Sequence, residues 1–139
     1  MGKLCIYLEK AFSSMNILYK KVINDNKIFY KVNFPEASIF CGTVNLVIDN
    51  VFSAEISAFV ARGISQSKRA EILESINEIN EGFQFISVAV DKSNDVYSYQ
   101  QFILAGGEDI MCKQIITNLV AFYDLHRRAA QKIHEVLNN

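Results

Sequence analysis

The chain has 139 residues and a mass of 15.8 kDa; 50% of its residues are hydrophobic and 21% are charged. This size fits one domain, residues 1–139, and the composition is too apolar for a disordered chain. The formal net charge of −1 gives no strong field that would recruit nucleic acid or an anionic membrane. There is no apolar run of about 18 residues and no signal-peptide pattern, so we expect a cytoplasmic protein with no membrane partner.

The first part of the chain indicates a helix followed by strands. Leu4, Leu8, Phe12 and Met15 recur at spacings of three or four, which predicts an amphipathic helix over residues 3–14. Residues 17–23 fit either a strand or the frayed end of this helix. Strict alternation of apolar and polar residues then predicts three antiparallel strands, over residues 27–34, 38–49 and 51–61, with one buried face.

The second part predicts a helix, a hairpin and a longer helix. An apolar stripe of isoleucines after Ser65 indicates a middle helix that ends at Gly82. Residues 83–90 and 96–104 predict a two-strand hairpin around a polar turn. The long helix follows Gly106 and Gly107. The expected fold class is therefore α+β, in which a three-strand antiparallel sheet and a two-strand hairpin pack with an N-terminal, a middle and a long C-terminal helix.

No residue pattern predicts catalytic, cofactor or metal chemistry. Cys5, Cys41 and Cys112 are widely separated and form no CxxC pair, so we expect buried, reduced thiols. His126 and His134 have no potential ligand three or four residues away that would complete a helical metal site. His126 lies at an apolar heptad position, which favours a half-buried imidazole with one hydrogen-bonding partner.

A basic and aromatic cluster and a wide helix face are the two surface features that suggest a partner. The cluster comprises Tyr19, Lys20, Lys21, Lys27, Phe29, Tyr30 and Lys31. It could bind single-stranded nucleic acid, but the net charge favours no nucleic-acid partner. The long helix has a second apolar row, and two tyrosines mark a strand face; together they form a candidate interface of Cys112, Ile116, Val120, Tyr123, Tyr97 and Tyr99. A larger intramolecular core explains the helix row equally well.

The stretch from residue 68 to residue 80, KRAEILESINEIN, resembles the signature helix of the YbjN-like domain family, which ends in an N-x-x-N pair before the second hairpin. Here the pair is Asn77 and Asn80. The family is similar in fold to the type III secretion chaperones, small α+β proteins that commonly dimerise and hold protein segments without performing chemistry. The resemblance supplies no catalytic residue, and we expect Asn77 and Asn80 to cap the helix or to tie it to the following strand.

Two hypotheses about function follow. The first is a non-enzymatic, chaperone-like or regulatory domain, a homodimer, that binds a protein segment through its sheet or its C-terminal helix. The second is a small-molecule-binding regulator or weak enzyme with a pocket between sheet and helices, lined by Tyr97, Tyr99, Gln101 and His126.

Overall fold

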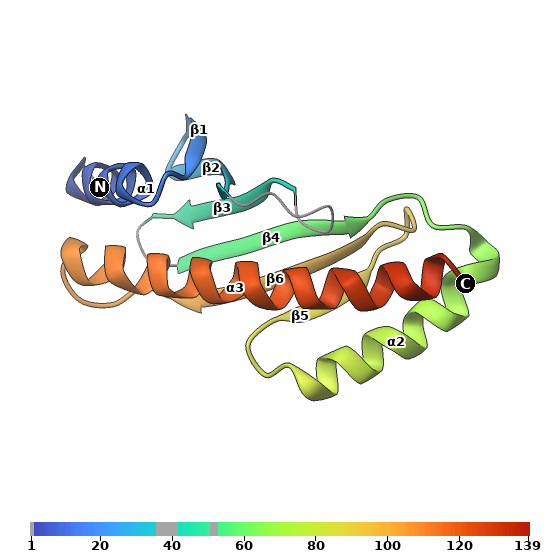
Figure 1. Cartoon of the computed structure of the whole chain (residues 1–139). Helices are drawn as coiled ribbons and strands as arrows, with labels where there is room; N and C mark the ends of the chain where they lie inside the picture. The colour runs from blue at the N-terminus through green and yellow to red at the C-terminus, as the bar shows by residue number, and fades with distance from the viewer. Residues whose placement is uncertain (1, 36–41, 51–52) are drawn as a thin grey trace.

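The computed structural model describes residues 2–35, 42–50 and 53–139. The helices are α1 (Gly2–Ser14), α2 (Arg69–Gly82) and α3 (Glu108–Leu137), and a short 3₁₀ turn, Gln66–Lys68, precedes α2. The strands are β1 (Leu18–Asn24), β2 (Lys27–Asn33), β3 (Val44–Asp49), β4 (Ser53–Ala61), β5 (Ser87–Val90) and β6 (Val96–Ile103) (Figure 1). This arrangement confirms the α+β class.

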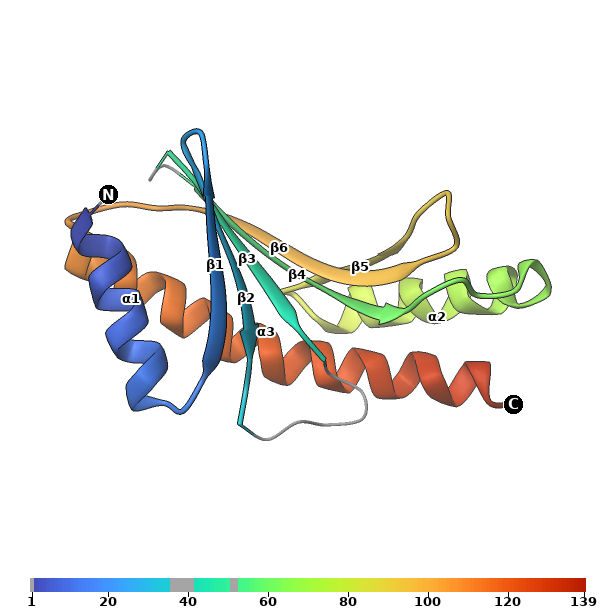
Figure 2. The same ribbon diagram turned by 90° about the horizontal axis from the view of Figure 1, so that it is seen from above.

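The six strands form one antiparallel sheet in the order β1-β2-β3-β4-β6-β5. The three helices pack against the same face of this sheet, with α1 beside β1 and α3 running across the central strands (Figure 2). The other face carries no helix among the described residues. We call the helix-covered side the inner face and the uncovered side the open face.

The core lies between the inner face and the helices, as the alternation of side chains predicts. In β2, β3 and β4 every second side chain is buried, beginning with Ile28, Val44 and Ala54. The three helices contribute their apolar stripes, and α3 alone buries eight side chains along its 30 residues. Burial of this continuous layer supplies the main favourable term in folding.

The sheet has six strands, and the expectation of five was wrong. Residues 18–24 form β1, the segment for which the sequence left a strand and a helix end open. All seven of its side chains are exposed, so it has no contrast between a buried and a polar face. The hairpin strand β5 begins at Ser87, later than residue 83, and the beginnings of the strands expected from residues 38 and 51 lie outside the described residues.

Candidate functional site

The open face is a broad surface on which large apolar side chains are exposed among polar ones. Its side chains, which alternate with the buried set in the register, include Leu18, Lys20, Val22, Lys27, Phe29, Lys31, Asn45, Val47, Asp49, Ser53, Glu55, Ser57, Phe59, Tyr97, Tyr99, Gln101 and Ile103. Leu18 is 74% exposed, Ile103 78% and Phe59 45%. These side chains lie on β1, β6 and β4, so exposed apolar area is spread across the sheet.

Aromatic side chains gather on the part of the open face formed by β4 and β6. The rings of Tyr97 and Tyr99 lie beside each other, 5.7 Å apart between centroids. The guanidinium of Arg62 covers the ring of Phe59 at 4.3 Å from its centroid, a favourable cation–π geometry. These side chains present rigid apolar area together with hydroxyl and guanidinium donors, a combination enriched at protein interfaces.

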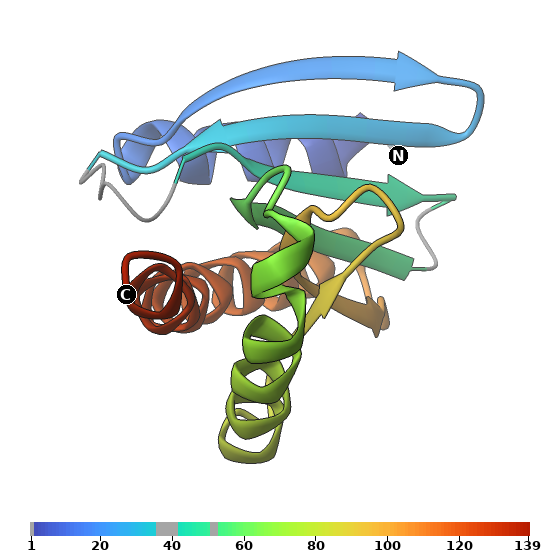
Figure 3. The ribbon, with the colours of Figure 1, turned by 90° about the vertical axis from the view of Figure 1, so that its right-hand side faces the viewer.

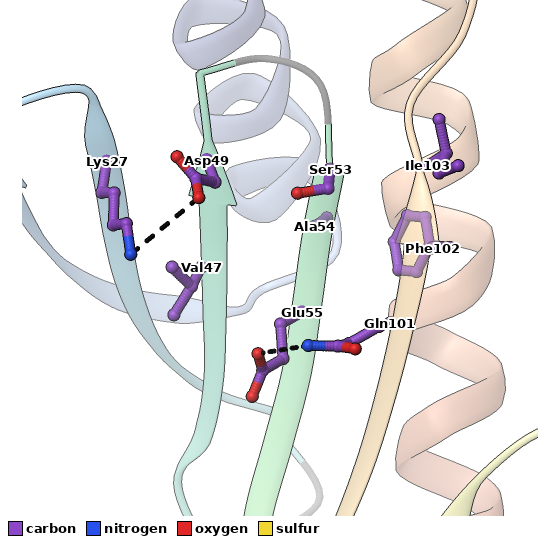
Figure 4. Close-up of a pocket in the computed structure, with 9 residues that line it drawn as sticks. All are labelled: Lys27, Val47, Asp49, Ser53, Ala54, Glu55, Gln101, Phe102 and Ile103. Carbon is purple, nitrogen blue, oxygen red and sulfur yellow. Dashed lines mark hydrogen bonds and ion pairs between the residues drawn. The ribbon is translucent and has the colours of Figure 1, made fainter.

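Two hollows indent the open face, and Glu55 lines both of them. The first, of about 330 Å³, lies across β3, β4 and β6 and is lined by Lys27, Val47, Asp49, Ser53, Ala54, Glu55, Gln101, Phe102 and Ile103 (Figure 4). Within it, Gln101 Nε2 donates a hydrogen bond to Glu55 Oε2 at 3.0 Å, and Lys27 Nζ lies 3.9 Å from Asp49 Oδ2. The second, of about 260 Å³, lies toward Tyr97. Together they make a shallow trough.

Two lysines on the open face stand directly opposite each other. Lys20 on β1 is the cross-strand partner of Lys31 on β2. Among the residues that the structure describes, neither lysine has an acidic side chain within ion-pair distance, whereas Lys21 and Lys27 are paired with Glu9 and Asp49. Like charges directly opposite each other destabilise a sheet. This corner of the open face therefore carries uncompensated positive charge.

On the inner face, Glu9 ties α1 to the β1–β2 hairpin. Its carboxylate accepts hydrogen bonds from the hydroxyls of Tyr19 and Tyr30 at 2.8 and 2.9 Å, and from Lys21 Nζ at 2.8 Å. Burial acts to raise the pKa of Glu9, but the hydrogen bonds from Lys21, Tyr19 and Tyr30 outweigh it and hold this pKa below its ordinary value. Burial also raises the pKa of Tyr30, whose hydroxyl contacts the Cys5 thiol as well.

A third hollow lies beside this cluster, between α1 and β1, with a volume of about 540 Å³. Its lining is mostly apolar and consists of Gly2, Cys5, Ile6, Glu9, Lys21, Ile23 and Ile28. Ile6 and Ile23 are both more than half exposed there. The strand that lines it, β1, is the last strand at this edge of the sheet (Figure 3).

Within the described ranges 2–35, 42–50 and 53–139, no three His, Cys, Asp or Glu side chains are placed to hold a metal ion. Nor does any helix there have the length and hydropathy needed to cross a bilayer. The open face offers apolar contact, hydrogen-bonding groups and charge.

No protein-family model and no curated protein matches the sequence. Two solved structures match the fold along nearly the whole chain. The crystal structure of YbjN, a candidate transcription regulator from E. coli, has 8% identity and a TM-score of 0.58 over 90% of each chain. That of an uncharacterized protein from Methanothermobacter thermautotrophicus has 14% identity and a TM-score of 0.61, over 97% of this chain and 96% of the other. The chain has a YbjN-like fold. At these identities the likeness shows the fold alone.

The helix that carries the resemblance is fixed to the hairpin of the YbjN-like fold by one of its two asparagines. Asn80 Nδ2 donates to the carbonyl of Val88 at 3.0 Å, and Asn80 Oδ1 accepts from the amide of Val88 at 2.8 Å. This pair of bonds ties the end of α2 to β5. Asn77 lies exposed one turn earlier.

The pocket expected from Tyr97, Tyr99, Gln101 and His126 is not formed, because these residues lie on opposite sides of the sheet. Tyr97, Tyr99 and Gln101 point to the open face, whereas His126 lies fully buried on α3 against the inner face. There its Nδ1 pairs with Ser98 Oγ at 2.8 Å, and its ring stacks on Phe122. Burial lowers the pKa of His126 to about 4.

The six residues of the candidate interface likewise divide between two surfaces. In α3, Cys112 is buried, which raises the pKa of its thiol, and Ile116 and Tyr123 are partly buried against the core. The ring of Tyr123 stacks on Phe34, 4.1 Å between centroids. Val120 alone among the four helix residues is exposed beyond 40%, at 43%. Tyr97 and Tyr99 lie on the opposite side of the sheet.

Sequence reasoning missed the pairing of Lys20 with Lys31 and the position of Glu9. The alternation of Leu18, Lys20 and Val22 was the available signal for β1. It was weak because Ile17, Tyr19, Lys21 and Ile23 give the other face of the strand almost the same mixture of apolar and basic side chains.

Proposed function

We propose that this chain is a non-enzymatic protein-binding domain that holds a segment of a partner protein on the open face of its sheet. The observation that carries the proposal is that three helices cover one face while the other exposes Leu18 on β1, Ile103 on β6, and Phe59 opposite Tyr97. Apolar and aromatic area rimmed by polar groups is typical of binding surfaces. Binding of this kind needs no catalytic residue.

The open face also has the form that an extended segment requires. Its trough runs over three neighbouring strands, and its lining alternates apolar side chains with hydrogen-bonding ones such as Gln101 and Ser53. A regulatory role, of the sort suggested for YbjN, fits a domain that acts by occupancy alone. Homodimerisation is a separate proposal, for which the exposed part of α3 around Val120 offers a surface.

A random-peptide phage library panned on the immobilised chain tests the proposal without knowledge of the partner. We expect enriched peptides to bind the variant Phe59→Asp about tenfold more weakly than the unaltered chain, because a carboxylate replaces an apolar contact. The matched control is Leu73→Asp on α2, since Leu73 is exposed to a similar degree, 42%. Absence of enrichment, or equal loss in both variants, would contradict binding on the open face.

The first hollow favours a second candidate function, recognition of a small polar molecule. Lys27, Asp49, Ser53, Glu55 and Gln101 converge on it with both signs of charge. Its volume of about 330 Å³ is at the lower end of the range for ligand sites. Thermal-shift screening of amino acids and nucleotides against the chain and its Gln101→Ala variant would reveal such a ligand.

A further inference from the structure

The free edge of β1 has three features that together describe a partner. The first is its backbone: β1 has β2 on one side, and no described residue pairs with its other edge, which leaves a row of unpaired amides and carbonyls. Exposed edges of this kind are templates for one more strand. The seven residues from Leu18 to Asn24 are long enough to pair with a typical strand.

The second feature is charge. On the open face Lys20 would be the direct cross-strand neighbour of one residue of an added strand, and Lys31 lies behind Lys20 on the next strand, β2. Both lysines lack an acidic partner among the described residues, so a carboxylate opposite Lys20 would enter a region of positive charge. Cross-strand pairs of opposite charge are stabilising, and like pairs are not. The edge therefore favours an acidic residue in this position.

The third feature is apolar space on both sides of the acidic position. Leu18 and Val22 flank Lys20 on the open face and are 74% and 61% exposed. On the inner face, the hollow between α1 and β1 exposes Ile6 and Ile23 at the same edge. A strand added here would cover these side chains with its own alternate residues, because successive side chains point to opposite faces.

We propose that the edge of β1 binds an extended, mostly apolar protein segment that carries an acidic residue opposite Lys20 and joins the sheet as an additional strand. The inference rests on the proposed function, because it names the chemistry and the position of the bound segment. A second copy of this chain fits less well. Two-fold antiparallel pairing along the whole of β1 would place Val22 of the second copy opposite Lys20, and the strand LYKKVIN contains no acidic residue to compensate Lys20 and Lys31.

Two synthetic peptides of equal length test the inference, one with a single central glutamate among valine, isoleucine and threonine residues, the other with lysine in place of the glutamate. Fluorescence anisotropy should show the glutamate peptide binding about tenfold more tightly than the lysine peptide. The variant Lys20→Glu should reverse this preference. Lys92→Glu, with the same change of charge in the turn between β5 and β6, should preserve it. Equal binding of the two peptides, or a preference that Lys20→Glu does not alter, would overturn the inference.

Amide hydrogen exchange separates strand addition from docking on the face. Bound glutamate peptide should slow exchange at alternate residues of 18–24, because only every second amide of an edge strand points outward. Binding that is lost in Phe59→Asp and leaves the β1 amides unchanged would overturn the edge site while the proposed function stands.

Failure of the phage selection alone would count against binding on the open face, not against binding at the edge of β1. Displacement of the peptide by single-stranded oligothymidine at equal concentration would identify a nucleic-acid site and overturn the inference.

Discussion

The imidazole of His126 on α3 and the hydroxyl of Ser98 on β6 form a hydrogen bond of 2.8 Å, and both side chains are fully buried. This contact fixes the longest helix against the sheet. The other ring nitrogen, Nε2, meets no hydrogen-bonding group of the described residues. Protonation of this ring would place a charge in the core, so the contact is one that requires a neutral histidine.

Stability should therefore depend on pH between the two pKa values of His126. Burial lowers the folded-state pKa to about 4 from 6.5, so the unfolded chain binds the extra proton first as pH falls. Above about pH 6.5 His126 is neutral in both states, and the free energy of unfolding is unaffected by its titration. As the pH falls from about 6.5 to about 4, this free energy should decrease by an amount on the order of 3 kcal/mol. Urea unfolding at several pH values measures it. The double variant His126→Phe with Ser98→Ala should flatten this slope, and an unchanged slope would contradict the assignment.

The variant Lys20→Glu should be more stable than the unaltered chain. It replaces a repulsive cross-strand pair with an attractive one to Lys31, a gain of at most about 1 kcal/mol because both side chains are exposed. Thermal unfolding at low and high salt measures the effect, which should shrink as salt rises. Lys92→Glu controls for net charge, and an equal gain there would exclude the cross-strand explanation.

Asn80→Ala should destabilise the fold by about 1–3 kcal/mol, because it leaves both backbone groups of Val88 without their side-chain partner. Asn77→Ala on the same helix is the matched control and should change stability by less than about 0.5 kcal/mol, since Asn77 is exposed like Asn80 but makes no side-chain hydrogen bond to a described residue. Denaturant unfolding compares the two. Similar losses in both variants would show that helix propensity, and not the tie to β5, accounts for the effect.

Val120→Asp should leave the chain folded, whereas Ile115→Asp should unfold it, because Val120 is 43% exposed and Ile115 is completely buried. Circular dichroism checks the fold, and light scattering then gives the solution mass of the folded variant. We expect a homodimer that uses the exposed part of α3 to dissociate in Val120→Asp. A dimer that persists would place its interface elsewhere.

The strands that bury one face could be predicted from the sequence. The register between neighbouring strands could not. Ile28, Tyr30 and Val32 alternate with polar residues, so the buried side of β2 follows from the pattern. The pattern of β1 gives no such contrast, because this edge strand is exposed on both faces. Nothing local in the sequence indicates that Lys20 stands opposite Lys31, because pairing depends on the register of the hairpin.

The candidate site illustrates the same limit. Tyr97, Gln101 and His126 were chosen for their chemistry, and each lies on an element that the sequence predicts. Their separation onto two faces of the sheet depends on which side of β6 the helix α3 covers. The covered side of β6 carries Val96, Ser98, Gln100 and Phe102, and the polar Ser98 and Gln100 give no sign in the sequence that this side is buried.

The first and last helices of the chain meet: the amide of Leu4 in α1 donates a hydrogen bond to Glu108 Oε1 at the start of α3, at 3.3 Å. During synthesis on the ribosome, α1 and the first four strands emerge long before α3 does. The inner face must then remain without its principal cover for most of translation. Ribosome-bound chains ending before residue 108 should consequently bind general chaperones, and release should accompany the emergence of α3.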